Sequence, residues 1–383
     1  MSRFIYLDYN ATTPTDARVA EAMAPYLTGF FGNPSSGHLA GRDAKAAIER
    51  AREQVARCLG CAADEVVFTS GGSESDNLAL RGVAAARGGG HVVTSAIEHP
   101  AVLETALAME MEGAIRLTVV GVDDQGRVDP DEVAAAIADD TVLVSIMLAS
   151  NEVGTLEPIA AIARGCRDRG VRLHTDAAQA VGKVPVDVVA LGVDLLTVAG
   201  HKLYAPKGIG ALYVRDGVAI EPLIRGAGHE RRLRAGTENI LEIVGLGAAC
   251  ELVRTEATAE GGWLSALRDR LRNRLVAAVP DLVEHAARAN RLPNTLSVSL
   301  PGVRAGDLLA SVGDRLAASA GAACHGLTVQ VSHVLAAMGV SAEIALGTVR
   351  FSVGRFTTEE EVDRGAEIVL AAMEAGSSSA STA

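Results

Sequence analysis

The stretch RLHTDAAQ (Arg172–Gln179) decides the fold class that this sequence predicts. Its apolar start is typical of a short strand, and the acidic residue Asp176 stands where that strand would end. A second apolar run, Leu195–Val198, is followed in the same way by a polar turn, Gly200–Lys202. In open α/β sheets, ligands bind at the carboxyl ends of the strands. The sequence therefore places a carboxylate and an amine at one candidate ligand site.

The same alternation of short apolar runs and amphipathic stretches extends outward from this pair. Strands alternating with helices favour a mostly parallel sheet that is covered by helices on both faces. The further strands predicted are Glu65–Thr69, His91–Ser95, Arg116–Val120, Val142–Leu148 and Gly210–Val214, and the helices include Pro130–Ala138 and Ile159–Arg169.

The pattern of predicted helices and strands changes after about Val253, where a smaller α+β domain is predicted. A chain of 383 residues exceeds the size at which one core keeps growing, so two domains are expected. We predict a large domain over 13–255, a small domain over 1–12 and 256–375, and a Ser/Ala-rich disordered tail over 376–383. The small domain's predicted elements are a helix at Trp263–Ala278, a strand at Thr295–Leu300, a helix at Gly306–Val312, a loop around Cys324, a helix from Ser332, a strand at Thr348–Ser352 and a helix at Glu359–Ala375.

Composition excludes several classes of function. A net charge of -12 disfavours non-specific binding to nucleic acid or to an anionic membrane. The apolar runs are shorter than the roughly 20 residues that a membrane span needs, and Met1–Asp8 lacks the apolar core of a signal peptide. We therefore predict a cytoplasmic protein that binds neither DNA nor a membrane.

The chain has five cysteines, and an odd number in a long chain argues against a disulfide framework. Cys58 and Cys61 form a C-x-x-C pair, which we interpret as small residues at the end of a helix that starts near Asp43. A redox pair or half a metal site is the alternative, but the sequence holds no second such pair, and we predict no metal site.

Three features predict a phosphate-bearing cofactor and a reactive thiol. The turn Gly71–Ser75 leads from a predicted strand into a helix, and backbone N–H groups there can cradle a phosphate. Lys202 and Asp176 could then hold one cofactor, the lysine covalently and the aspartate through a pyridine nitrogen. Asp176 could equally cap a helix, and lysines usually lie at the surface. Cys324 stands among small residues that leave it accessible, although most free cysteines are buried.

The segment GHKLYAPKG (Gly200–Gly208) and further motifs in the same order resemble the cysteine desulfurases of the class V aminotransferase superfamily. Within that family, the segments Ser319–His325 and Arg350–Arg355 are especially similar to selenocysteine lyases, as are Thr197–Lys202 and Arg291–Thr295. The motifs that carry the resemblance are Tyr6–Pro14, Gly32–Ser36, Thr69–Asn77, Glu98 with His99, Ser150–Gly154, Arg234–Asn239 and Arg350–Glu361.

The resemblance implies a fold and a set of roles. The expected fold is the aspartate-aminotransferase-like α/β architecture of pyridoxal-phosphate fold type I, in a homodimer. Lys202 would bind pyridoxal 5'-phosphate, Asp176 its pyridine nitrogen, and Cys324 the sulfur or selenium, while His99 would stack on the ring and move a proton. The remaining roles are Asn151 and Gln179 near the ring hydroxyl, Gly72, Ser73, His201 and a partner subunit's Thr237 at the phosphate, and Arg350 and Asn33 at the substrate.

The function implied is a cysteine desulfurase that converts L-cysteine to L-alanine, leaves a persulfide on Cys324 and passes sulfur to an acceptor protein. A selenocysteine lyase is the alternative, followed by a transaminase or other lyase on this fold and by a non-catalytic sulfur-delivery scaffold. Three departures from the family pattern stand out. Ser73 replaces a common Thr, Ala199 replaces a phosphate-binding Ser, and His325 follows Cys324 where Thr or Ser is usual.

Overall fold

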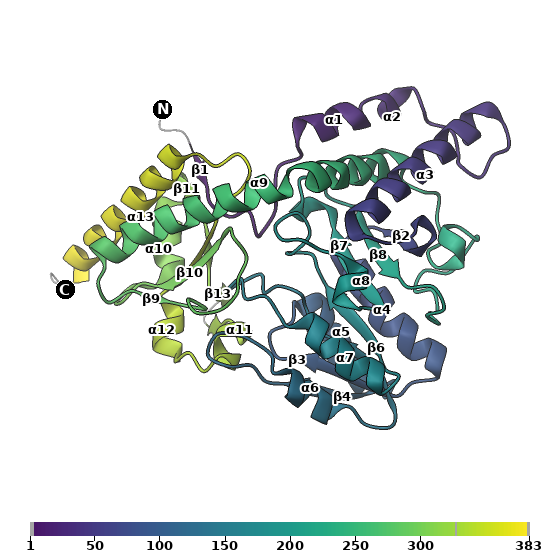
Figure 1. The fold of residues 1–383 in the computed structure, drawn as a ribbon. Coiled ribbons are helices and arrows are strands. Elements are labelled where there is room, and N and C mark those ends of the chain that lie inside the picture. Colours follow the sequence, from purple (N-terminus) through teal and green to yellow (C-terminus); the bar gives the residue numbers. More distant parts are fainter. Residues whose placement is uncertain (1–3, 326–327, 381–383) are drawn as a thin grey trace.

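The structure is a computed structural model that describes residues 4–325 and 328–380. Its largest feature is a seven-stranded sheet with the order β2-β8-β7-β6-β5-β3-β4 (Figure 1). Strands β3 to β7 run parallel, and β8 runs antiparallel to both neighbours, which confirms the predicted mostly parallel sheet. The bounds are β2 Val66–Thr69, β3 His91–Ser95, β4 Arg116–Val120, β5 Thr141–Ser145, β6 Arg172–Asp176, β7 Leu195–Ala199 and β8 Gly210–Val214.

Helices cover both faces of this sheet, because successive side chains along a strand point to opposite faces. In β2, Val66 and Phe68 belong to the apolar core on one face, and Val67 belongs to the core on the other. The first face packs against α3 (Leu39–Leu59), α6 (Pro130–Ala136), α7 (Ile159–Asp168) and the first half of α9 (Ile240–Ala278), and the second against α4 (Gly72–Arg87) and α5 (Pro100–Met111).

A second, smaller core forms around the other half of α9, which runs across both parts of the molecule (Figure 1). Ile5 and Leu7 are buried in this core, so the start of the chain joins the smaller part. Its elements are β1 (Ile5–Tyr6), paired with β11 (Leu316–Ala317), a four-stranded sheet of β12 (Ser319–Ala320), β15 (Thr348–Ser352), β10 (Thr295–Ser299) and β9 (Val283–Glu284), and the helices α10 (Ala305–Val312) and α13 (Glu359–Ala380).

The carboxyl ends of the sheet's strands bring distant segments together. β6 ends at Asp176, and the turn Gly200–Lys202 follows directly after β7. β2 leads through Ser70 and Gly71 into α4, and β3 leads to His99, which caps the start of α5. The carboxylate, the amine and the candidate phosphate turn of the sequence therefore face one edge of the sheet.

Most predicted elements are confirmed, and β3, β4, β8 and β15 have the predicted bounds. The strand predicted at Val142–Leu148 is shorter in the structure, where β5 spans Thr141–Ser145. Ile146 and Leu148 nevertheless donate backbone hydrogen bonds to His174 and Asp176, so the chain stays beside β6 up to the edge of the site.

Three expectations about the C-terminal third differ from the structure in detail. The helix predicted from Trp263 is the second half of α9, which begins at Ile240. The predicted domain boundary at residue 255 therefore falls inside a helix, between Val253 of the larger core and Leu264 of the smaller one. The predicted loop around Cys324 is a hairpin of β13 (Ala322–His325) and β14 (Thr328–Val331). The tail predicted from Gly376 instead continues α13 as far as Ala380. No helix in 4–325 or 328–380 is long and apolar enough to cross a membrane.

Candidate active site

A cavity of about 450 Å³ lies between the carboxyl ends of the large sheet and Arg350 on β15. Its size is typical of small-molecule sites. Nine of the twelve predicted site residues line it, namely Gly72, Ser73, His99, Asn151, Asp176, Gln179, His201, Lys202 and Arg350. Asn10, Ala11, Asp76, Met147, Ala149, Ala178 and Ala199 complete the lining.

The amine of Lys202 is held by the N-terminal segment. Its Nζ donates to the carbonyl oxygens of Asn10, at 2.5 Å, and Ala11, at 2.8 Å. Burial and the nearby Arg350 guanidinium lower the pKa of Lys202 from 10.5 to about 8. A substantial fraction of the amine is therefore unprotonated near neutral pH, which a nucleophilic lysine requires.

Two buried carboxyl groups form the floor of the cavity. Asp176 accepts a hydrogen bond from the backbone N–H of Ala178 at 2.8 Å, and burial raises its pKa. Burial and the neighbouring Asp176 raise the pKa of Asp76 well above its usual range, and one of the oxygens of Asp76 has no hydrogen-bond partner in the described part of the chain. Such a pair favours a positively charged ligand group beside Asp176.

His99 presents a defined face to the cavity. Its Nδ1 accepts the backbone N–H of Ala101 at 3.1 Å, so the neutral imidazole carries its proton on Nε2. Burial, followed by the charges of Lys202 and His333, lowers the pKa of His99, although Asp176 and Glu152 oppose this. The neutral ring can therefore donate a hydrogen bond from Nε2.

The turn before α4 has the features of a phosphate cradle. Gly71, with φ of 151°, precedes the helix, and no side chain caps the first N–H groups of α4. A Cβ at Gly72 would lie 3.3 Å from the Cβ of Ala199, so the glycine permits close approach between α4 and β7. His201 is held at Nδ1 by the Thr12 hydroxyl at 3.1 Å, and burial lowers its pKa to about 4, so its ring is neutral at neutral pH.

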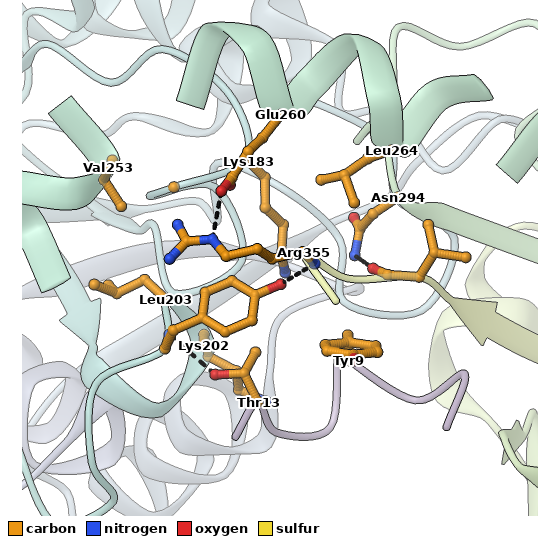
Figure 2. Close-up of a pocket in the computed structure, with 13 residues that line it drawn as sticks. Tyr9, Thr13, Lys183, Lys202, Leu203, Val253, Glu260, Leu264, Asn294 and Arg355 are labelled. Carbon is orange, nitrogen blue, oxygen red and sulfur yellow. Dashed lines mark hydrogen bonds and ion pairs between the residues drawn. The ribbon is translucent and has the colours of Figure 1, made fainter. Parts of the chain in front are cut away.

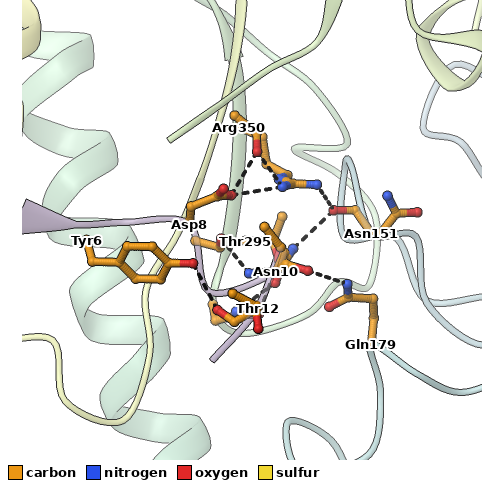
Figure 3. A network of polar contacts seen from close by, with 12 residues as sticks. Tyr6, Asp8, Asn10, Thr12, Asn151, Gln179, Thr295 and Arg350 are labelled. Atoms are coloured by element: carbon orange, nitrogen blue, oxygen red, sulfur yellow. Dashed lines mark hydrogen bonds and ion pairs between the residues drawn. The ribbon is translucent and has the colours of Figure 1, made fainter. Parts of the chain in front are cut away.

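Arg350 reaches the cavity from β15 and is fixed by three hydrogen bonds (Figure 3). Nη1 donates to the Asn151 carbonyl at 3.0 Å, and Nη2 donates to Asp8 Oδ1 at 2.9 Å and Ser319 Oγ at 2.7 Å. The buried Nε–H has no partner among the residues that the structure describes. A fixed guanidinium with a spare donor suits a carboxylate ligand.

Two predicted residues do not line this cavity, and the side chain of a third lies outside what the structure describes. Asn33 and Thr237 are exposed, and Asn33 Oδ1 accepts from the backbone of Ser35 instead. Cys324 lies on β13, opposite Val329 on β14, and its side chain is outside what the structure describes, as is that of His325.

The sequence interpretation missed several residues of the site. Asn10 and Asp8 contact Lys202 and Arg350, and Asp76 lies beside Asp176. The motif Tyr6–Pro14 already contained two of them, and its unusual density of polar residues beside a strand was the available signal.

The C-x-x-C pair lies apart from the cavity. Cys58 and Cys61 are half-buried and pack against the larger core. Burial raises the pKa of the Cys61 thiol to about 12, which disfavours the reactive thiolate there. Both observations are consistent with the interpretation of Cys61 as a packing residue, whereas a hydrogen bond with Cys250 lowers the pKa of Cys58.

Comparison with known proteins agrees with this geometry. A fold-type-I sheet with a lysine, a buried aspartate and a phosphate turn at its edge defines a class of pyridoxal-phosphate enzymes. The family model described as "Aminotransferase class-V" matches residues 5–364, and the chain belongs to this family.

The curated relatives and solved structures are similar over almost the whole chain. Cysteine desulfurase IscS of Dictyoglomus turgidum is 45% identical over 95% of this chain and 93% of its own length, and that of Anaeromyxobacter dehalogenans is 47% identical over 94% and 90%. A solved NifS-like protein has a TM-score of 0.91 at 38% identity, covering 97% of this chain and all of its own. A structure described as SspA in complex with cysteine has a TM-score of 0.81 at 36% identity, over 92% and 100%.

The cofactor of this family, pyridoxal 5'-phosphate, fits the residues present. Lys202 would supply the amine, Asp176 would place a buried carboxylate at the pyridine nitrogen, and the start of α4 would bind the phosphate. The glycine at position 72 leaves room that a Cβ would fill.

Proposed function

We propose that this protein is a cysteine desulfurase that removes sulfur from L-cysteine, releases L-alanine and leaves a persulfide on Cys324. The observation that carries the proposal is the single cavity that joins Lys202, Asp176 and His99 to the free donor of Arg350. The relatives named cysteine desulfurase and the cysteine complex of a structural neighbour support the substrate.

The chain's own residues supply binding, positioning and proton transfer. Arg350 binds the substrate carboxylate, and Lys202 offers its amine to the same cavity. Bound pyridoxal phosphate supplies the electron sink that makes the substrate's α-proton acidic. His99, neutral and protonated on Nε2, offers a hydrogen-bond donor to the cavity, and the family resemblance assigns it the transfer of a proton.

The sulfur transfer balances without an outside oxidant. The carbon–sulfur bond of cysteine breaks, a sulfur–sulfur bond to Cys324 forms, and a proton takes the place of sulfur on the carbon that becomes the alanine methyl group. The attacking Cys324 must be a thiolate, because the thiol is a poor nucleophile. An acceptor protein then takes the sulfur from the persulfide.

A homodimer in the cytoplasm completes the proposal. Asn33 and Thr237, which the family resemblance places near substrate and phosphate, are exposed in the single chain. Phe31, 80% exposed, and Leu27, 65% exposed, lie near Asn33 and form an apolar surface that a second copy would cover. Sedimentation of the holoenzyme should give a dimer; a monomer with full activity would contradict this part.

A paired assay of alanine release from L-cysteine and L-selenocysteine tests the substrate. The proposal expects turnover of cysteine that disappears in Cys324→Ala. Turnover of selenocysteine alone would favour the selenocysteine lyase that the Ser319–His325 segment resembles.

A further inference from the structure

Lys183 is one of only four lysines in the chain, and it is buried directly behind Lys202. The two side chains border a small cavity of about 10 Å³ that Asn294 and Glu260 also line (Figure 2). Glu260 pairs with Arg355 there. Lys183 donates instead to two neutral amide oxygens, Gln179 Oε1 at 2.5 Å and Asn10 Oδ1 at 3.2 Å. Lysine is seldom buried, and neither the reaction above nor apolar packing explains this one.

The local backbone brings Lys183 against Gln179. After β6, the N–H groups of Val181 and Val184 donate to the carbonyl oxygens of Ala177 and Ala180, which winds the chain in a helical turn. Residues four apart on such a turn lie on the same side. Gln179 and Lys183 have this spacing, so their side chains meet.

The contacts of Gln179 fix which way its amide points. Its Nε2 donates to the carbonyl oxygen of Asn10 at 2.9 Å, and its Oε1 accepts from Lys183. A flipped amide would put oxygen against oxygen at Asn10 and nitrogen against the lysine amine. Burial, with the charges of Lys202 and Arg350, holds the pKa of Lys183 well below its usual range. Even the neutral amine keeps two N–H groups, one for each amide oxygen.

Asn10 accepts a hydrogen bond from the same lysine, and Figure 3 shows its further contacts with Asn151, Gln179 and Thr295. Its Oδ1 accepts from Lys183 and Asn294, and its Nδ2 donates to the Asn151 carbonyl and the Thr295 hydroxyl. Its own carbonyl oxygen accepts from Lys202 and Gln179. Lys183 thus stabilises both amides that stand between it and the active-site cavity.

We propose that Lys183 is a positioning residue that keeps the Gln179 amide nitrogen directed at the cavity, so that the site offers an N–H donor to the ring oxygen of the cofactor. Gln179 lines the cavity, and its nitrogen has a second N–H beyond the one given to Asn10. A donor there stabilises the ionised ring oxygen, whereas an amide oxygen would repel it. This inference rests on the assignment of the chain as a pyridoxal-phosphate enzyme.

The test is a pH titration of the visible absorption of the bound cofactor in Lys183→Met. Loss of the donor disfavours the ionised ring oxygen and so favours the protonated form of the bound cofactor. The midpoint of the titration should therefore rise by about one pH unit, a tenfold change in proton affinity. The other titratable and charged groups near Lys202, which are Asp8, His99, Asp176, His201 and Arg350, are unchanged by the substitution. Lys207→Met removes an exposed lysine and should leave the midpoint in place.

A double-mutant comparison separates positioning from simple loss of charge. Gln179→Ala should raise the midpoint as Lys183→Met does, and Lys183→Met should add nothing in the Gln179→Ala background. An unchanged midpoint in Lys183→Met, or an equal shift in both backgrounds, would overturn the proposal.

A second variant tests the proposal if Lys183→Met does not fold. Lys183→Gln keeps one donor and should raise the titration midpoint by less, and it should add nothing in the Gln179→Ala background. An unchanged midpoint in Lys183→Gln would overturn the proposal. Wild-type protein that takes up no pyridoxal phosphate would contradict the proposed function itself, and that result is distinct from a failure of the Lys183 variants.

Discussion

Replacing Arg350 with lysine should weaken substrate binding while leaving the cofactor bound. The guanidinium is held at Nη1 and Nη2 by Asn151, Asp8 and Ser319, and its Nε–H has no partner in the described part of the chain. A lysine has one nitrogen and cannot keep these contacts and also meet both oxygens of a carboxylate. Losing one charged hydrogen bond costs about 1.5–3 kcal/mol. The expected fall in kcat/KM is therefore about 10- to 150-fold.

The assay is initial-rate alanine release from L-cysteine, combined with binding followed through the cofactor's absorption. The dissociation constant of L-cysteine should rise, whereas that of cysteamine, which lacks the carboxylate, should stay within about threefold. Arg304→Lys, on the exposed surface, serves as the matched control. A wild-type kcat/KM in Arg350→Lys, or equal losses for both ligands, would refute the assignment of Arg350.

Three further predictions address the cofactor. Borohydride reduction should attach the cofactor to Lys202 alone, and label on Lys183 or Lys207 would contradict that assignment. In cofactor-free protein, the rate at which acylating reagents modify the Lys202 amine should rise through about pH 8, because burial and Arg350 lower the pKa of Lys202. Asp176→Asn should keep the cofactor but lower kcat by about 10²–10³-fold, and near wild-type turnover would make Asp176 a mere helix cap. Ala199→Ser restores a hydroxyl beside the phosphate turn and should tighten cofactor binding about 2- to 12-fold, because one hydrogen bond contributes about 0.5–1.5 kcal/mol. Weaker cofactor binding in a titration of the apoprotein would contradict the interpretation that Ala199 lacks a phosphate-binding hydroxyl.

The strands and the strand-end residues could be predicted because their signals are local. Buried parallel strands are short apolar runs, and β7 is followed at once by the polar turn that holds Lys202. The fold then brings Lys202 and Asp176 together, since strands β6 and β7 are neighbours in the sheet. His99 and Arg350 were predicted as site residues only from the resemblance to the family, because no sequence spacing connects them to Lys202 or Asp176.

Other features depend on contacts that the sequence does not display. Gly261 and Gly262 lie within α9, although glycine is unfavourable in helix interiors, and the helix predicted in this region began only after them, at Trp263. Packing overrides this low propensity, because Leu246 is buried in one core and Leu267 in the other. Asn10 was missed for a similar reason, since its partners are far away along the chain.

The central claim is tested most directly at Cys324. A thiol attacks well only when ionised, and the carbon–sulfur bond of cysteine requires that attack. After one turnover with L-cysteine, mass spectrometry of the intact protein and its peptides should find one added sulfur on Cys324 and one equivalent of alanine. Cys324→Ala should lose both products with cysteine yet keep some alanine release from selenocysteine, because selenium leaves carbon more easily. Full cysteine activity in Cys324→Ala, or sulfur found on another cysteine, would contradict the account.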